Sequence, residues 1–138
     1  MKAVNKTGQA TLDKLTAGLD ANNRSRTLDS DRGFMPLHVE YLFTTKTGPV
    51  YSLAHYYRQN GDSMRDPDME FLKSDDGRYY PLSFRQDNLG IMQEDVLWND
   101  DGTIKGCYTR RQRDHATFAG LWMANIRAQQ NVSQQEEN

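Results

Sequence analysis

The sequence predicts an α+β domain in which an antiparallel six-strand meander packs against a carboxyl-terminal helix, with a short amino-terminal helix before the sheet. Two observations carry this prediction. In the middle of the chain, apolar and polar residues alternate in successive short segments, which is typical of half-buried strands. Short turns rich in Asn, Asp and Gly join these segments. Such turns connect antiparallel neighbours, whereas a parallel crossover needs about a dozen residues.

Length and charge restrict the class of protein. The 138 residues fit one domain that is long enough to bury a core, and 17 basic against 19 acidic residues leave a net charge of -2. No overall field therefore favours nucleic acid. The start of the chain has no apolar run typical of a signal peptide, and no segment approaches the ~18 apolar residues of a membrane span. A single cysteine, Cys107, cannot form an internal disulfide. We expect a cytoplasmic protein with no membrane partner and no cofactor.

The elements before the sheet are weakly marked. Leucines at intervals of three and four predict a helix over residues 11–19, with Thr11 or Thr7 as its cap. We expect residues 1–10 to be flexible and the polar stretch 21–33 to be a mobile connection.

Six segments carry the strand pattern, and the Asn60–Gly61 pair between two of them is a turn signal because both residues accept positive φ. The predicted strands are residues 37–44, 50–57, 68–73, 79–85, 91–98 and 103–108.

The last helix is the clearest element. We expect one stripe of it to cover the sheet, with Thr109 and Gln112 forming a capping box at its start. This single domain spans residues 11–129, and the polar tail, residues 130–138, is expected to be disordered. The predicted stripe consists of Phe118, Leu121, Trp122, Asn125, Ile126 and Gln129.

Residues 56–71 hold the densest group of charged side chains. Asp66, Asp68 and Glu70 alternate at period two, so an extended chain places them on one strand face. Together with Asp62 they could hold a divalent cation, but the spacing fits neither a carboxylate nuclease motif nor a calcium loop. We favour a solvated or salt-bridged strand face with Arg58 and Arg65 as the partners.

A second charged group opens the last helix. Arg110, Arg111 and Arg113 lie where the helix dipole disfavours positive charge, and Arg127 follows on the same helix. These arginines could bind phosphate groups, or they could pair with the acidic residues 62–68, which is the interpretation that we favour.

The histidines give no catalytic pattern. Neither His55 nor His115 has a serine or cysteine at a diagnostic spacing. Both are expected to be structural residues with hydrogen-bond partners.

Three segments occur in order along the chain: residues 56–62 (YYRQNGD) with 66–70 (DPDME), residues 80–84 (YPLSF) with 86–87 (QD), and residues 118–126 (FAGLWMANI). Together they resemble an uncharacterised family of small domains found in phage, plasmid and conjugative-element proteins of bacteria. The resemblance covers residues 37–129 and leaves residues 1–35 outside. It implies a mobile-element setting and brings no reaction, cofactor or catalytic residue.

The mobile-element setting that this resemblance implies favours a non-enzymatic binding protein that acts on a host protein, with counter-defence, such as anti-CRISPR or antirestriction activity, as the most specific version. The expected partner-binding residues are Arg58, Asp62, Arg65, Asp66, Asp68 and Glu70. Two alternatives stay open. One is a metal-dependent hydrolase or nuclease that uses Asp62, Asp66, Asp68 and Glu70, and the other is a nucleic-acid binder that uses Arg110, Arg111, Arg113 and Arg127.

Overall fold

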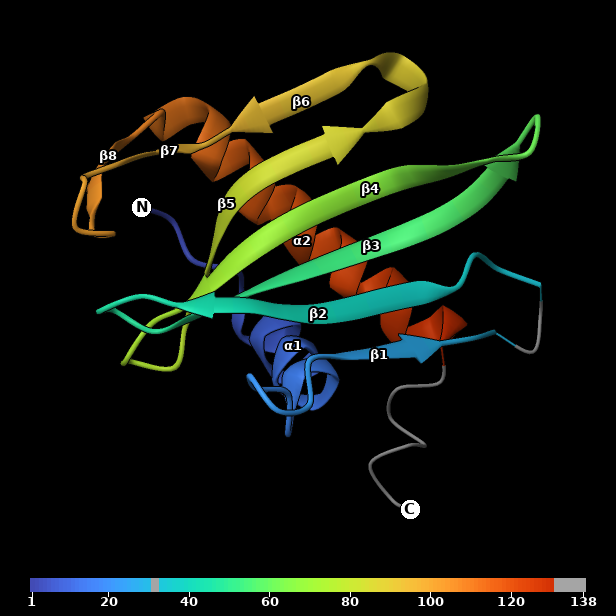
Figure 1. The fold of residues 1–138 in the computed structure, drawn as a ribbon, viewed down its shortest axis with the longest axis horizontal. Helices are drawn as coiled ribbons and strands as arrows, with labels where there is room; N and C mark the ends of the chain where they lie inside the picture. Colours follow the sequence, from blue (N-terminus) through green and yellow to red (C-terminus); the bar gives the residue numbers. More distant parts are fainter. Residues whose placement is uncertain (31–32, 131–138) are drawn as a thin grey trace.

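The computed structural model describes residues 1–30 and 33–130, and its architecture confirms the α+β class. A single antiparallel sheet has both helices on one face (Figure 1). The opposite face of the sheet is called the outer face below. The main strands are β1 (Ser25–Leu28), β2 (Leu37–Thr44), β3 (Pro49–Gln59), β4 (Asp62–Lys73), β5 (Tyr79–Gln86) and β6 (Ile91–Glu94), paired in chain order.

The predicted six-strand antiparallel sheet is confirmed, but its members differ from the six predicted strands at both ends of the sheet. The strand β1 lies within residues 21–33, which we took for a connection; its only buried side chain is Leu28, too little for a visible pattern. The predicted strand 91–98 is interrupted at Asp95, whose side chain is buried. The second part, β7 (Val96–Trp98), pairs instead with β8 (Ile104–Cys107) in a separate two-stranded sheet.

The first helix, α1 (Lys6–Thr16), begins before its predicted start. Asn5 is its cap and accepts a hydrogen bond from the Gly8 amide at 2.8 Å, so the assignment of Thr11 or Thr7 as the cap was wrong. Residues 6–10, which we placed in a flexible terminus, belong to this helix, and Val4 before it is buried in the core.

The long helix α2 (Thr109–Gln129) buries a different stripe from the one predicted. Trp122 and Ile126 are buried as expected, but Phe118 is 37% exposed and Leu121 66% exposed. The helix packs against α1 as well as the sheet, and the two helices approach closely where Asn5 contacts Gly120. Small residues are therefore needed on the side of α2 that faces α1. The buried residues of α2 are Gln112, His115, Ala116, Ala119, Gly120, Trp122, Met123 and Ile126.

The ends of α2 also differ from the prediction. No capping box forms, because Tyr108 is the cap. The Gln112 side chain instead accepts a hydrogen bond from the Lys2 amide and donates one to the Lys2 carbonyl, each at 2.8 Å. Gln130, which we placed in the disordered tail, is buried and donates to the Met35 carbonyl at 2.9 Å. Residues 131–138 lie outside the described residues.

The outer face is covered at one end only. There, Val96 of β7 packs with Val50, Leu72 and Leu82 of the main sheet in a second, smaller core. No helix in the described part of the chain has the length and apolar character to cross a membrane.

Candidate functional site

A single transverse row of serines and glutamates crosses the outer face. In the pairing register Ser25 lies opposite Glu40, Glu40 opposite Ser52, and Ser52 opposite Glu70. The row continues from Glu70 to its partner Ser83 and from there to Glu94. Directly paired residues point to the same face of a sheet, so all these side chains lie on the outer face. The serine–glutamate row consists of Ser25, Glu40, Ser52, Glu70, Ser83 and Glu94.

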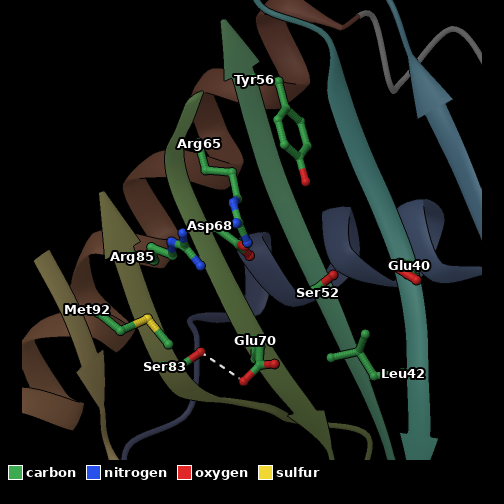
Figure 2. A pocket seen from close by; sticks show the side chains of 10 residues that line it. All are labelled: Glu40, Leu42, Ser52, Tyr56, Arg65, Asp68, Glu70, Ser83, Arg85 and Met92. Atoms are coloured by element: carbon green, nitrogen blue, oxygen red, sulfur yellow. Dashed lines mark hydrogen bonds and ion pairs between the residues drawn. The ribbon is translucent and has the colours of Figure 1, made fainter. Parts of the chain in front are cut away.

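Part of the row lies in a groove of about 300 Å³ (Figure 2). The Ser83 hydroxyl donates to Glu70 Oε1 at 3.0 Å across the groove floor. Tyr56, Leu42 and Met92 add aromatic and aliphatic surface to its walls. The groove is lined by Glu40, Leu42, Ser52, Tyr56, Arg65, Asp68, Glu70, Ser83, Arg85 and Met92. It therefore offers both charge and apolar contact to a ligand.

The glutamates of the row form no ion pairs with described residues, although the Arg111 charge opposes the rise that burial causes in the pKa of Glu94. Burial raises the pKa of Glu70, the Ser83 hydrogen bond opposes this rise, and the nearby Glu94 and Asp68 charges add to it. Burial also raises the pKa of Glu94, assisted by Asp95. Among the described residues no lysine or arginine forms an ion pair with Glu40, Glu70 or Glu94. Because folding raises the pKa of Glu70 and of Glu94, their ionised side chains lower the stability of the folded state at neutral pH.

At the other end of the groove, basic and acidic side chains form ion pairs with one another. Arg65 Nη1 lies 3.3 Å from Asp68 Oδ2, and Arg65 Nε lies 3.6 Å from Asp87 Oδ2. Arg85 Nε lies 2.6 Å from Asp87 Oδ1. Arg65 pairs with Asp68 as predicted, but Arg58, the other predicted partner, forms no ion pair with a described residue. Asp87, which is distant in the sequence from the 56–71 segment, was not predicted as the second partner of Arg65.

The carboxylates of the 56–71 segment do not converge. A register shift places Asp66 and Pro67 opposite His55 alone, so Asp66 does not continue the alternation of Asp68 and Glu70. Asp66 instead accepts from Gln86 Nε2 at 2.7 Å, and Asp62 is exposed near the hairpin tip. No three His, Cys, Asp or Glu side chains in residues 1–30 and 33–130 are placed to hold a metal ion.

The arginines of α2 are dispersed, and their predicted pairing with residues 62–68 was wrong. Arg111 Nε lies 3.3 Å from Asp95 Oδ1, and its guanidinium lies over the Tyr108 ring at 4.4 Å. Arg127 donates to Thr11 Oγ1 at 2.6 Å and so ties α2 to α1. Only Arg110 and Arg113 are exposed on the surface.

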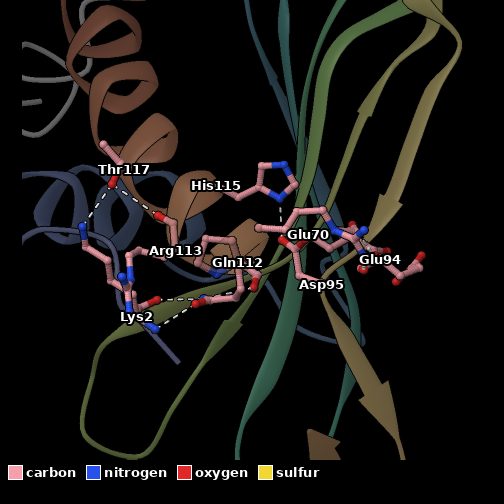
Figure 3. A network of polar contacts seen from close by, with 11 residues as sticks. Lys2, Glu70, Glu94, Asp95, Gln112, Arg113, His115 and Thr117 are labelled. Atoms are coloured by element: carbon pink, nitrogen blue, oxygen red, sulfur yellow. Dashed lines mark hydrogen bonds and ion pairs between the residues drawn. The ribbon is translucent and has the colours of Figure 1, made fainter. Parts of the chain in front are cut away.

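Both buried histidines have hydrogen-bond partners, as predicted for structural residues. His115 Nδ1 lies 2.6 Å from Oδ2 of the fully buried Asp95 (Figure 3). His55 Nδ1 accepts from Trp122 Nε1 at 3.1 Å, and its Nε2 lies 3.4 Å from Gln130 Oε1. Burial lowers the pKa of His55, which keeps its ring neutral. These contacts hold α2 to the sheet.

The fold and this site define a small α+β domain with one helix-covered and one open sheet face. The family model of a domain of unknown function, DUF6908, matches residues 10–132, and the chain belongs to this family. The match confirms the resemblance to an uncharacterised family and extends it into residues 10–35, which we had placed outside. No curated protein and no solved structure matches the chain.

Several site residues were not predicted from the sequence. Glu40, Ser52, Ser83 and Glu94 each occupy a position in a predicted strand, but no motif joins them. Only the strand register places them in one row, and the sequence signal available was limited to their polar character within alternating segments.

Proposed function

We propose that the protein is a non-enzymatic binding protein that holds its partner on the outer face of the sheet. The observation that carries this proposal is the groove in the outer face, where the unpaired carboxylates of the serine–glutamate row lie beside apolar side chains. Carboxylates without ion pairs do not stabilise the fold, whereas on a binding surface they can attract a partner of opposite charge.

The β3–β4 hairpin supports the same proposal. Pairing of β2 with β3 ends at His55, and pairing of β5 with β4 ends at Asp68, so the hairpin continues beyond both neighbours as a two-stranded ribbon (Figure 1). At its tip Arg58 and Asp62 are exposed, and neither forms an ion pair with a described residue. A partner in the groove would also reach this ribbon.

In its most specific form, the proposal is a counter-defence inhibitor encoded by a phage or another mobile element, which acts on a host protein in the cytoplasm. An acidic face that occupies a basic nucleic-acid channel is a physical route to such inhibition. Arg58, Asp62, Arg65, Asp68 and Glu70 remain proposed contacts in this form. Asp66 is less suited, because it does not line the groove and is half-buried beside Gln86, from which its carboxylate accepts.

The two alternative functions have weaker support. A metal-dependent hydrolase needs converging oxygen ligands, and Asp66 and Glu70 have separate partners, Gln86 and Ser83. A nucleic-acid binder needs free cations, and Arg111 and Arg127 both have structural contacts.

Filling the groove tests the proposal without changing any charge. Ser52 lies at the centre of the row, and Ser52→Trp adds an indole that strands tolerate well. We expect this variant to fold and to lose the specific partner that the tagged wild-type protein captures from lysate of the cells that encode it. The amount captured is measured by quantitative mass spectrometry.

The matched control is Ala124→Trp, which adds the same side chain on the exposed side of α2. It should retain the partner. Equal capture by Ser52→Trp and the wild type, with both proteins folded by circular dichroism, would show that the groove is not the binding site.

A further inference from the structure

We propose that the serine–glutamate row binds a basic segment of a protein partner, in the polyproline II conformation and with an arginine or lysine at every third position. This inference rests on the proposed function, because it names the partner chemistry for the same outer face. It is argued from the spacing of the row, from its charge and from the position of the serines.

The spacing of the row selects the conformation of the segment. Glutamates occupy alternate strands, and strands lie about 4.7–4.9 Å apart, so neighbouring glutamates are about 9.4–9.8 Å apart along the row. A β-strand repeats its side chains on one face after about 6.6 Å and fits poorly. Three residues of polyproline II rise about 9.3 Å, which matches the row over its three glutamates.

The charges of the outer face determine where the segment lies. Glu40, Glu70 and Glu94 have no cationic partner among the described residues, so a basic side chain at each would complete an ion pair. Arg65 and Arg85 share this face, but both are paired with acidic residues at one side of the row. That side therefore offers no carboxylate without a cationic partner, so the segment follows the row itself.

The serines complete the fit. The backbone of polyproline II makes no internal hydrogen bonds, and its polar groups need outside partners. Ser52 lies between Glu40 and Glu70 in the groove, so its hydroxyl can donate to a backbone carbonyl of the segment. The Ser83 hydroxyl already donates to Glu70 and holds that carboxylate in place between the other two glutamates. The aliphatic stems of arginine or lysine can pack on Leu42 in the groove wall.

The test uses two fluorescein-labelled peptides and fluorescence anisotropy. The first peptide has three Arg-Pro-Pro repeats, and the control peptide has the same length and the same number of arginines, placed at every second position. We expect the wild-type protein to bind the first peptide about tenfold more tightly, since only its arginines can pair with all three glutamates in register.

Two triple variants separate the row from net charge. Glu40→Gln/Glu70→Gln/Glu94→Gln should weaken binding of the first peptide by about tenfold or more. Asp29→Asn/Asp75→Asn/Asp100→Asn removes the same charge from exposed positions outside the row and should change it less than about twofold. Equal binding of both peptides, equal loss in both variants, or no binding at low salt would overturn the inference. If the peptide fails while Ser52→Trp still abolishes partner capture, the proposed function stands and only the basic-segment inference is lost.

Discussion

Replacing Trp122 with alanine should lower the free energy of unfolding by about 3 to 5 kcal/mol, as large-to-small substitutions of buried aromatic residues do. Trp122 is 4% exposed and lies in the main core between α2 and the sheet. Its indole also packs edge-on against the His55 ring, with 5.5 Å between centroids. The substitution leaves a cavity and removes the donor to His55 Nδ1, so two costs add. Urea denaturation of both proteins measures the difference.

The neighbouring residue provides the control for this measurement. Leu121 belongs to the stripe predicted from the sequence but is 66% exposed, and Leu121→Ala should cost less than about 0.5 kcal/mol. If Leu121→Ala costs more than Trp122→Ala, α2 packs through the predicted stripe and its described orientation is wrong.

Asp95→Ala should lower the free energy of unfolding by about 1.5 to 3 kcal/mol, because it removes a buried carboxylate and leaves the buried His115 ring without its hydrogen-bond partner. The Asp95 side chain is fully buried and bonds both His115 and Arg111. Its backbone also links β5 to the start of α2, since its amide donates to the Leu82 carbonyl at 2.7 Å and its carbonyl accepts from the Tyr108 amide at 2.9 Å. Thermal and urea unfolding of the variant report the loss.

Glu94→Gln is the matched substitution for Asp95, because Glu94 is the adjacent acid but is exposed and has no ion pair with a described residue. We expect it to change stability by less than about 0.5 kcal/mol. Similar small effects at both positions would contradict the paired, buried state of the Asp95 carboxylate.

Most of the fold could be predicted from local patterns in the sequence. Alternating apolar residues identified β2 to β5, and short turns fixed their antiparallel order, because both signals depend only on neighbouring residues. The interruption at Asp95 could not be predicted, since it depends on His115 and Arg111, which are distant in the sequence. The buried stripe of α2 also depended on a distant contact, that of Gly120 with Asn5.

The site was only partly predictable for the same reason. The shared face of Asp68 and Glu70 follows from their spacing within one strand. The alignment of Glu40 and Glu94 with Glu70 depends on the register of four strand pairs, which a single sequence does not specify. A bulge, which alternation cannot show, removed Asp66 from the predicted face.

The central claim is that the partner is bound on the outer face, and a chemical-shift map of the complex tests it most directly. We would record amide shifts of the isotopically labelled protein with and without the partner that it captures. The account predicts the largest shifts at Ser52, Glu70 and Ser83, with those of Leu121 and Ala124 on the exposed side of α2 unchanged. Large shifts confined to α2, with the serine–glutamate row unchanged, would contradict it.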